Sequence, residues 1–150
     1  MIEPAFQDRV DWQCYGCGRL NDHGLQIKSY WHGDEIVCAW RPEPYHVGHP
    51  GRLQGGVIAT IAICHGVWAA TAAAHKQEGR ELREPLDFTY STTALKLDLV
   101  KPVPIDCVLT FRAKVSDMHD GRATVSCSVL VGGEEHARAE TEHVRVRLSG

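Results

Sequence analysis

The sequence predicts an α+β domain in which one long helix is wrapped by a curved, largely antiparallel sheet of about six strands. A stretch without Asp, Glu or Lys runs from Gly51 to His75 and is too long for a strand. Segments of alternating apolar and polar residues, typical of strands, stand on both sides of it. The length of 150 residues suits one domain with one core, so residues 1–150 are expected to form a single domain.

The elements expected up to the helix are, in chain order, an irregular, cysteine-containing lead-in (1–22), two strands (24–31 and 34–41), a Pro- and Gly-rich loop (42–53) and the helix (about 55–77). The two strands meet at His32-Gly33, which is a turn signal. Gly79 and Pro85 follow the helix and are stop signals. The order of elements is therefore β-β-α, followed by further strands.

Four strands are expected after the helix, over 93–100, 107–115, 123–131 and 135–148. Asp120-Gly121 favours a type I′ hairpin between the second and third of them. The last strand changes parity, because Ala137 and Ala139 share one face whereas Val144 and Val146 share the other. We therefore expect a β-bulge near Glu142–His143.

Composition excludes some functions. The net charge is −3 and the pI about 6.3, which argues against a nucleic-acid partner bound through phosphate contacts. The expected helix is rich in Ala, Gly and Thr and poor in Leu and Phe, so we expect it to be surrounded by protein and not by a membrane. The first residues contain no apolar run and no lipidation motif, so a cytoplasmic protein with reduced thiols is expected.

Two of the six cysteines, Cys14 and Cys17, have the spacing of zinc ligands. A structural zinc site needs four ligands, and the sequence contains no second pair of this kind. His23 or another loop histidine is a conceivable addition. The sequence alone therefore predicts no metal site.

Three segments carry a resemblance to a known family: "CYGCGRLNDHGLQIKSY", "YHVGHPGRLQGGVIATIAICH" and "TTALKLDLVKPVP". Together they resemble the hot-dog-fold acyl-CoA thioesterases, in particular the PaaI-like (phenylacetate-degradation) branch of the 4-hydroxybenzoyl-CoA thioesterase superfamily. The resemblance extends from Cys14 to Arg147. It implies a coenzyme A thioester as substrate, no further cofactor, and a homodimer or homotetramer with active sites at the dimer interface.

The resemblance also implies site residues at the start of the helix. The family's His-Gly-Gly-like triplet corresponds to Gln54-Gly55-Gly56, in which a glycine amide polarises the thioester carbonyl. This role is physically reasonable, because a helix N-terminus presents free N–H groups and the positive end of the dipole. Gln54 is expected to donate a hydrogen bond to the same region.

One residue departs from the family pattern. The Asp or Glu that serves as base or nucleophile corresponds to Ile63, and the helix contains no carboxylate between Gly55 and Lys76. His65 is a candidate replacement as general base, or else a core histidine bonded to a backbone carbonyl. Cys64 is a candidate nucleophile, or else inert packing.

Other polar residues are assigned by position. Thr92 corresponds to a family residue that holds the attacking water, although threonine is also a common strand residue. The remaining candidates for contacts with the substrate or with coenzyme A phosphates, each of which is otherwise a plain surface residue, are His46, His49, Arg52, Lys101, Arg112 and Arg122.

Two functions follow from these observations. The first is an acyl-CoA thioesterase that hydrolyses a thioester at the helix start. The second is a non-catalytic acyl-CoA binding or sensing protein, because an apolar Ile63 neither takes a proton nor attacks a carbonyl. Dehydratase chemistry would need an Asp–His pair, and the helix carries none.

Overall fold

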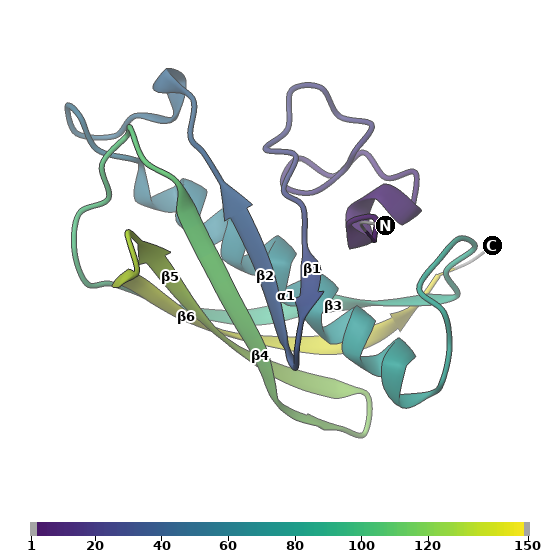
Figure 1. Cartoon of the computed structure of the whole chain (residues 1–150). Coiled ribbons are helices and arrows are strands. Elements are labelled where there is room, and N and C mark those ends of the chain that lie inside the picture. Colours follow the sequence, from purple (N-terminus) through teal and green to yellow (C-terminus); the bar gives the residue numbers. More distant parts are fainter. Residues whose placement is uncertain (1–2, 149–150) are drawn as a thin grey trace.

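The computed structural model describes residues 3–148. It contains one long helix that lies against the inner face of a curved, six-stranded sheet (Figure 1). The strand order is β1-β2-β4-β5-β6-β3, and every neighbouring pair is antiparallel. The helix is α1 (Gly55–Gln77), and the strands are β1 (Tyr30–His32), β2 (Glu35–Trp40), β3 (Phe88–Leu99), β4 (Leu109–His119), β5 (Arg122–Val131) and β6 (Glu134–Arg147). The predicted fold is confirmed.

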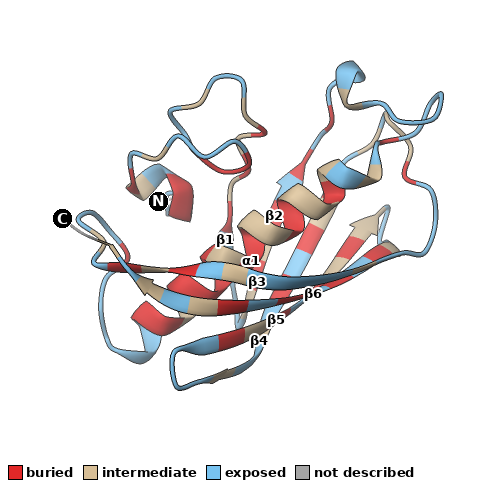
Figure 2. Ribbon diagram, turned by 180° about the vertical axis from the view of Figure 1, so that it is seen from behind, coloured by how far each residue is buried: buried red, intermediate tan, exposed pale blue. Residues whose placement is uncertain are grey.

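Protein surrounds helix α1 on most sides, and this is why an apolar surface on nearly every side of the helix is stable. Its residues Ile61 and Trp68 pack with Phe111 of β4 and Val125 of β5 in the main core, and all four are almost fully buried. Red segments on both the helix and the strands mark their buried residues (Figure 2). The helix is long and apolar enough to span a membrane, but 67% of its most apolar stretch is buried within the fold, as expected for a core helix.

The first predicted strand is wrong over most of its length, because only Tyr30–His32 pairs with β2. Residues 24–29 alternate as a strand would, but their backbone bonds to the lead-in and not to the sheet. The N–H of Leu25 donates to the carbonyl of Tyr15 at 2.8 Å, and the N–H of Phe6 donates to the carbonyl of Ser29 at 2.9 Å. The lead-in thus takes the place of a neighbouring strand.

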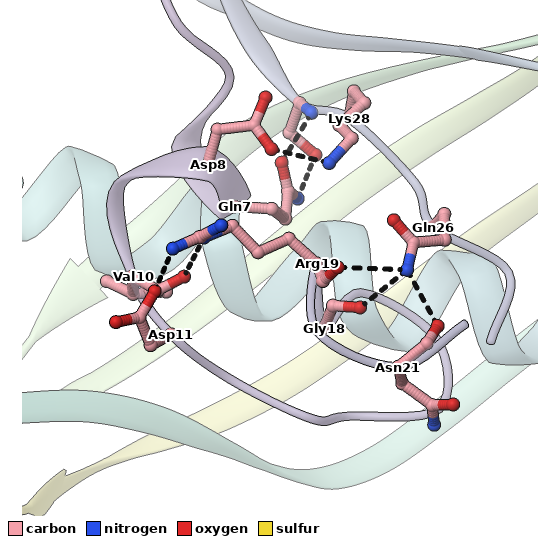
Figure 3. A network of polar contacts seen from close by, with 10 residues as sticks. Gln7, Asp8, Val10, Asp11, Gly18, Arg19, Asn21, Gln26 and Lys28 are labelled. Atoms are coloured by element: carbon pink, nitrogen blue, oxygen red, sulfur yellow. Dashed lines mark hydrogen bonds and ion pairs between the residues drawn. The ribbon is translucent and has the colours of Figure 1, made fainter. Parts of the chain in front are cut away.

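The lead-in is irregular, as predicted, but it is tied together by side chains. It begins with a short 3-10 helix, η1 (Phe6–Arg9), and then folds back over α1 (Figure 1). The Gln26 side chain donates to the carbonyls of Gly18, Arg19 and Asn21 at 3.1, 3.2 and 2.6 Å (Figure 3). Lys28 pairs with Asp8 at 2.5 Å in the same network.

The register between β3 and β6 shifts where the sequence predicts a bulge, but the extra residue is on β3 and not on β6. Thr92 of β3 pairs with His143, and Ala94 pairs with Glu142, so Thr93 is the inserted residue. Strand β6 keeps its parity up to this point, because Thr141 and His143 are both buried. The bulge therefore turns β3, and it leaves the His143 side chain inside the fold.

Candidate functional site

A cleft of 760 Å³ lies at the N-terminus of α1, between the loop before the helix and the end of β3. One isolated bridge, Val47 to Leu53, closes this loop on itself, and a second, Arg52 to Pro104, fixes it against the segment after β3. The N–H of Leu53 donates to the carbonyl of Val103 at 2.8 Å. The lining residues are Gly48, His49, Arg52, Leu53, Gln54, Gly55, Ile58, Leu99, Lys101, Pro102 and Val103.

The cleft combines an apolar wall with a cationic rim. Leu53, Ile58, Leu99 and Val103 supply the apolar wall. Arg52 and Lys101 carry the positive charges, and no Asp or Glu is among the described lining residues. Such a cleft suits a ligand with an apolar part and an anionic part.

The first turn of α1 offers free amide groups to this cleft. Gln54 is the N-cap residue, and its side chain makes no capping hydrogen bond. Among residues 3–148, no backbone acceptor is bonded to the N–H of Gly55 or Gly56. A Cβ atom at Gly55 would lie 2.9 Å from the Leu99 side chain, and one at Gly56 would lie 2.7 Å from Oε1 of Gln54. The two glycines therefore leave room that any larger residue would fill.

The loop residues predicted to contact substrate divide into two kinds. His49 lines the cleft and is exposed. His46 instead holds the loop, because its Nδ1 accepts from the N–H of Glu43 at 2.9 Å and its carbonyl accepts from the N–H of Gln54 at 2.9 Å. His46 thereby positions the residue that precedes the helix.

The cations predicted to bind phosphates are not all at the cleft. Lys101 lines it and is also paired with Glu134. Arg122 begins β5 beside the β4–β5 hairpin, which lies at the opposite end of the sheet from the cleft (Figure 1). Arg112 pairs with Glu35 and lines a separate, charged hollow over the sheet.

His65 lies inside the core. Its ring is fully buried, its Nδ1 accepts from the hydroxyl of Ser29 at 2.8 Å, and its Nε2 donates to the carbonyl of Ile36 at 2.9 Å. Burial lowers the pKa of His65 to about 4, so the ring is neutral at pH 7. This arrangement is that of a structural histidine, because its side-chain partner Ser29 is itself fully buried and His65 does not line the cleft.

Ile63 is half-buried on α1 and does not line the cleft of its own chain. The next part of the helix approaches β6 closely. A Cβ atom at Gly66 would lie 2.7 Å from Oγ1 of Thr141 and 2.9 Å from Nε2 of His143. The described structure thus places a histidine, and not a carboxylate, beside the middle of the helix.

Thr92 belongs to a chain of hydrogen bonds that the sequence did not reveal. Its hydroxyl lies 3.0 Å from Nδ1 of His143, and Nε2 of His143 lies 2.7 Å from the hydroxyl of Thr141. Burial lowers the pKa of His143 to about 4. The Thr92 hydroxyl is half-buried, so this pair, unlike His65 with its buried partner Ser29, has a polar group that solvent can reach.

Cys64 does not face the cleft either. Its sulfur lies 3.8 Å from Sγ of Cys14, and the thiol sulfurs of Cys14, Cys17 and Cys64 all lie within 4.8 Å of one another. The neighbouring thiol of Cys64 lowers the pKa of Cys14, and the same contact together with burial raises the pKa of Cys64. Within residues 3–148 these three side chains form the one cluster suited to hold a metal ion.

No family model matches the sequence, but comparisons with curated proteins and with solved structures do give matches. The chain is 24% identical over 123 residues to acyl-coenzyme A thioesterase THEM4 of Xenopus laevis. This match covers 75% of the chain but only 45% of the relative, so the chain spans less than half the length of that curated protein.

Solved structures agree in fold. A thioesterase superfamily protein of Shewanella loihica is 26% identical and superposes with a TM-score of 0.66, covering 86% of this chain and 96% of that one. The PaaI protein of the Escherichia coli phenylacetic acid degradation operon is 13% identical, with a TM-score of 0.66 and coverages of 84% and 82%. The chain therefore has the hot-dog fold, and it resembles the acyl-CoA thioesterases of that fold, PaaI among its structural neighbours.

Proposed function

We propose that this protein is an acyl-CoA thioesterase whose active site is the cleft at the start of α1. The observation that carries the proposal is the combination, in one cleft, of two free helix amides, an apolar wall and the cations Arg52 and Lys101. The acyl group lies along the apolar wall, and the cations face the phosphates of coenzyme A. The thioesterase names of the relatives support the same reaction class.

The amides of Gly55 and Gly56 stabilise the oxyanion that forms when water attacks the thioester carbonyl. Free N–H groups at a helix N-terminus are well suited to a developing negative charge, and removing one such donor in other enzymes costs about 10²–10³ in kcat. Gln54 adds a side-chain amide at the same place. Its side-chain oxygen lies close to Gly56, so the side chain must turn aside for a carbonyl to reach that amide.

The water needs a base, and Thr92 with His143 is the best candidate. These residues do not reach the cleft of their own chain, because Thr92 and Leu99 are seven positions apart on β3, a distance of about 20 Å at the rise of an extended strand. The base for each cleft must then come from a second copy of the chain.

Strand β3 is the element through which two copies of the chain can pair. It lies at one edge of the sheet, and its Leu95 and Leu99 side chains are exposed. An open edge strand of this length pairs readily with another strand. Because Thr93 is an inserted residue, antiparallel pairing of two β3 strands about a two-fold axis at Lys96 would place Thr92 of the partner subunit opposite Leu99, at the wall of the cleft.

The first experiment follows thiol release from short, aromatic and long-chain acyl-CoA esters. Hydrolysis is expected for at least one class, and Thr92→Val or His143→Gln should lower kcat about 10²-fold, because each removes part of the proton acceptor. Ser91→Ala, an exposed neighbour on the same strand, is the matched control and should retain activity. An absence of hydrolysis with every ester would refute the thioesterase proposal.

A mixing experiment tests the shared site. Gly56→Val blocks the helix amides and Thr92→Val removes the hydroxyl, so each variant alone should be inactive. If each site uses both subunits, co-expression produces mixed dimers with one intact site, and about a quarter of wild-type activity returns. If each site belongs to one chain, mixing restores nothing.

A second function is favoured by Ile63 and by the absence of a carboxylate from the described lining of the cleft. In that case the protein binds acyl-CoA without hydrolysing it. Calorimetry would then show binding in the absence of thiol release, and Ile63→Asp would create turnover. Hydrolysis by the wild-type protein would refute this alternative.

A further inference from the structure

We propose that Cys14, Cys17 and Cys64 bind one zinc ion that fastens the lead-in to helix α1. This site is separate from the cleft and does not depend on the thioesterase proposal. The sequence alone offers only the two cysteines of the lead-in, whereas the fold adds Cys64 from a position 50 residues further along the chain. The ligand set is therefore larger than the spacing of Cys14 and Cys17 suggests.

The lead-in is shaped to bring its two cysteines onto the helix. The N–H of Gly18 donates to the carbonyl of Cys14 at 2.8 Å, which closes a tight turn around the pair. A Cβ atom at Gly18 would lie 2.3 Å from the backbone nitrogen of Cys14, and one at Gly16 would lie 2.4 Å from Sγ of Cys64. Both glycines of "CYGCG" are thus required for the thiols to meet.

The sulfur positions match a metal better than a covalent bond between thiols. Zinc–sulfur bonds of about 2.3 Å in a tetrahedron place neighbouring sulfurs about 3.8 Å apart. The separation of Cys14 and Cys64 is 3.8 Å, and the other two distances do not exceed 4.8 Å. A disulfide needs its sulfurs about 2.05 Å apart and would leave the third thiol unused.

Thiolates are soft ligands that favour zinc over harder cations. Three protein ligands leave one position of the tetrahedron open. Cys14 is exposed while Cys17 is buried, so the open position faces solvent and takes a water molecule. Binding releases the thiol protons, and the bound metal then ties residues 14–17 to the helix.

The test measures zinc in the full-length protein after reduction, removal of metal with a chelator, incubation with zinc and desalting. We expect one zinc per chain in the wild type and almost none in Cys14→Ser, Cys17→Ser or Cys64→Ser. Cys107→Ser is the matched control and should keep its zinc, because Cys107 instead donates to the carbonyl of Pro104 at 3.1 Å. Cys14 is exposed, so its substitution leaves the core intact.

Cobalt provides an independent readout. Reduced wild-type protein titrated with Co²⁺ should develop thiolate-to-cobalt charge-transfer bands and the strong visible bands of a tetrahedral site, and Cys64→Ser should lack both. The proposal is overturned if reduced wild type takes up no zinc, or if Cys64→Ser retains as much as Cys107→Ser. Loss of two hydrogens by mass in air, without zinc uptake by the reduced protein, would overturn it in favour of a redox pair.

Discussion

Acidification should lower the free energy of unfolding through His65, and the size of this effect follows from the burial of its ring. The folded pKa of His65 is about 4, against 6.5 for an ordinary histidine, because burial disfavours the charged form. Between these two values the unfolded chain binds a proton that the native chain does not. Stability from this group is therefore complete above pH 6.5 and is lost as the pH falls toward 4.

The linkage relation gives the magnitude. With these two pKa values the proton favours the unfolded state by about 0.2 kcal/mol at pH 7 and by about 2 kcal/mol at pH 5. The free energy of unfolding should therefore fall by about 2 kcal/mol over this interval because of His65 alone. That is a sizeable share of the 5–15 kcal/mol expected for a domain.

Urea unfolding at pH 7 and pH 5, followed through the fluorescence of buried Trp68, measures this quantity. His65→Gln should be less stable at pH 7 but should lose about 2 kcal/mol less on acidification, because its amide can bond to Ser29 and Ile36 without titrating. His23→Gln, at an exposed lead-in residue, should behave as the wild type does. Equal losses in wild type and His65→Gln would refute the reasoning.

Three further results are expected. Ser29→Ala should lower the free energy of unfolding by about 1–3 kcal/mol, because both the Gln7 amide and the His65 ring lose a buried partner. The control Ser126→Ala, at an exposed residue, should cost little. Similar losses in both variants would show that the hydrogen bonds of Ser29 do not stabilise the fold. Gly66→Ala should cost about 1–3 kcal/mol by overpacking the helix against Thr141 and His143, and unchanged urea unfolding would show that the contact is loose. Lys101→Ala should raise KM for acyl-CoA about two- to fivefold at low salt, and Arg122→Ala should change it little. A larger rise in KM for Arg122→Ala than for Lys101→Ala would place the coenzyme A site near Arg122 and not at the cleft.

The helix and most strands could be predicted because their patterns are local. The continuous apolar stretch after Gly55-Gly56 predicts α1, and its observed bounds are Gly55–Gln77. Residues 24–29 mislead because Leu25 and Ile27 are buried, as in a strand, while their N–H groups bond to the lead-in. Periodicity reports which side chains are buried, but it does not report which segment provides the backbone partners.

The candidate site shows the same limit. His49, Gln54, Gly55 and Lys101 meet at the cleft because they lie in the loop before α1, at the start of α1 or just after β3, which are the segments that form it. His143 could not be identified in this way, since its place inside the fold depends on the bulge at Thr93 in a different strand. Long-range contacts of this kind leave no spacing signal in one sequence.

Cys64 and His65 provide the strongest argument about where the chemistry lies. They follow Ile63 directly and are the candidates to replace the missing carboxylate, yet neither lines the cleft, and each contacts the lead-in or a residue bonded to it. Cys64 meets Cys14, and His65 meets Ser29, whose hydroxyl also accepts from Gln7 of η1 at 2.8 Å. This part of α1 therefore anchors the lead-in. The thioesterase proposed above therefore needs a proton acceptor outside this part of the helix, and our candidate is the Thr92–His143 pair, which lies beside Gly66 and next to the open sheet edge formed by β3.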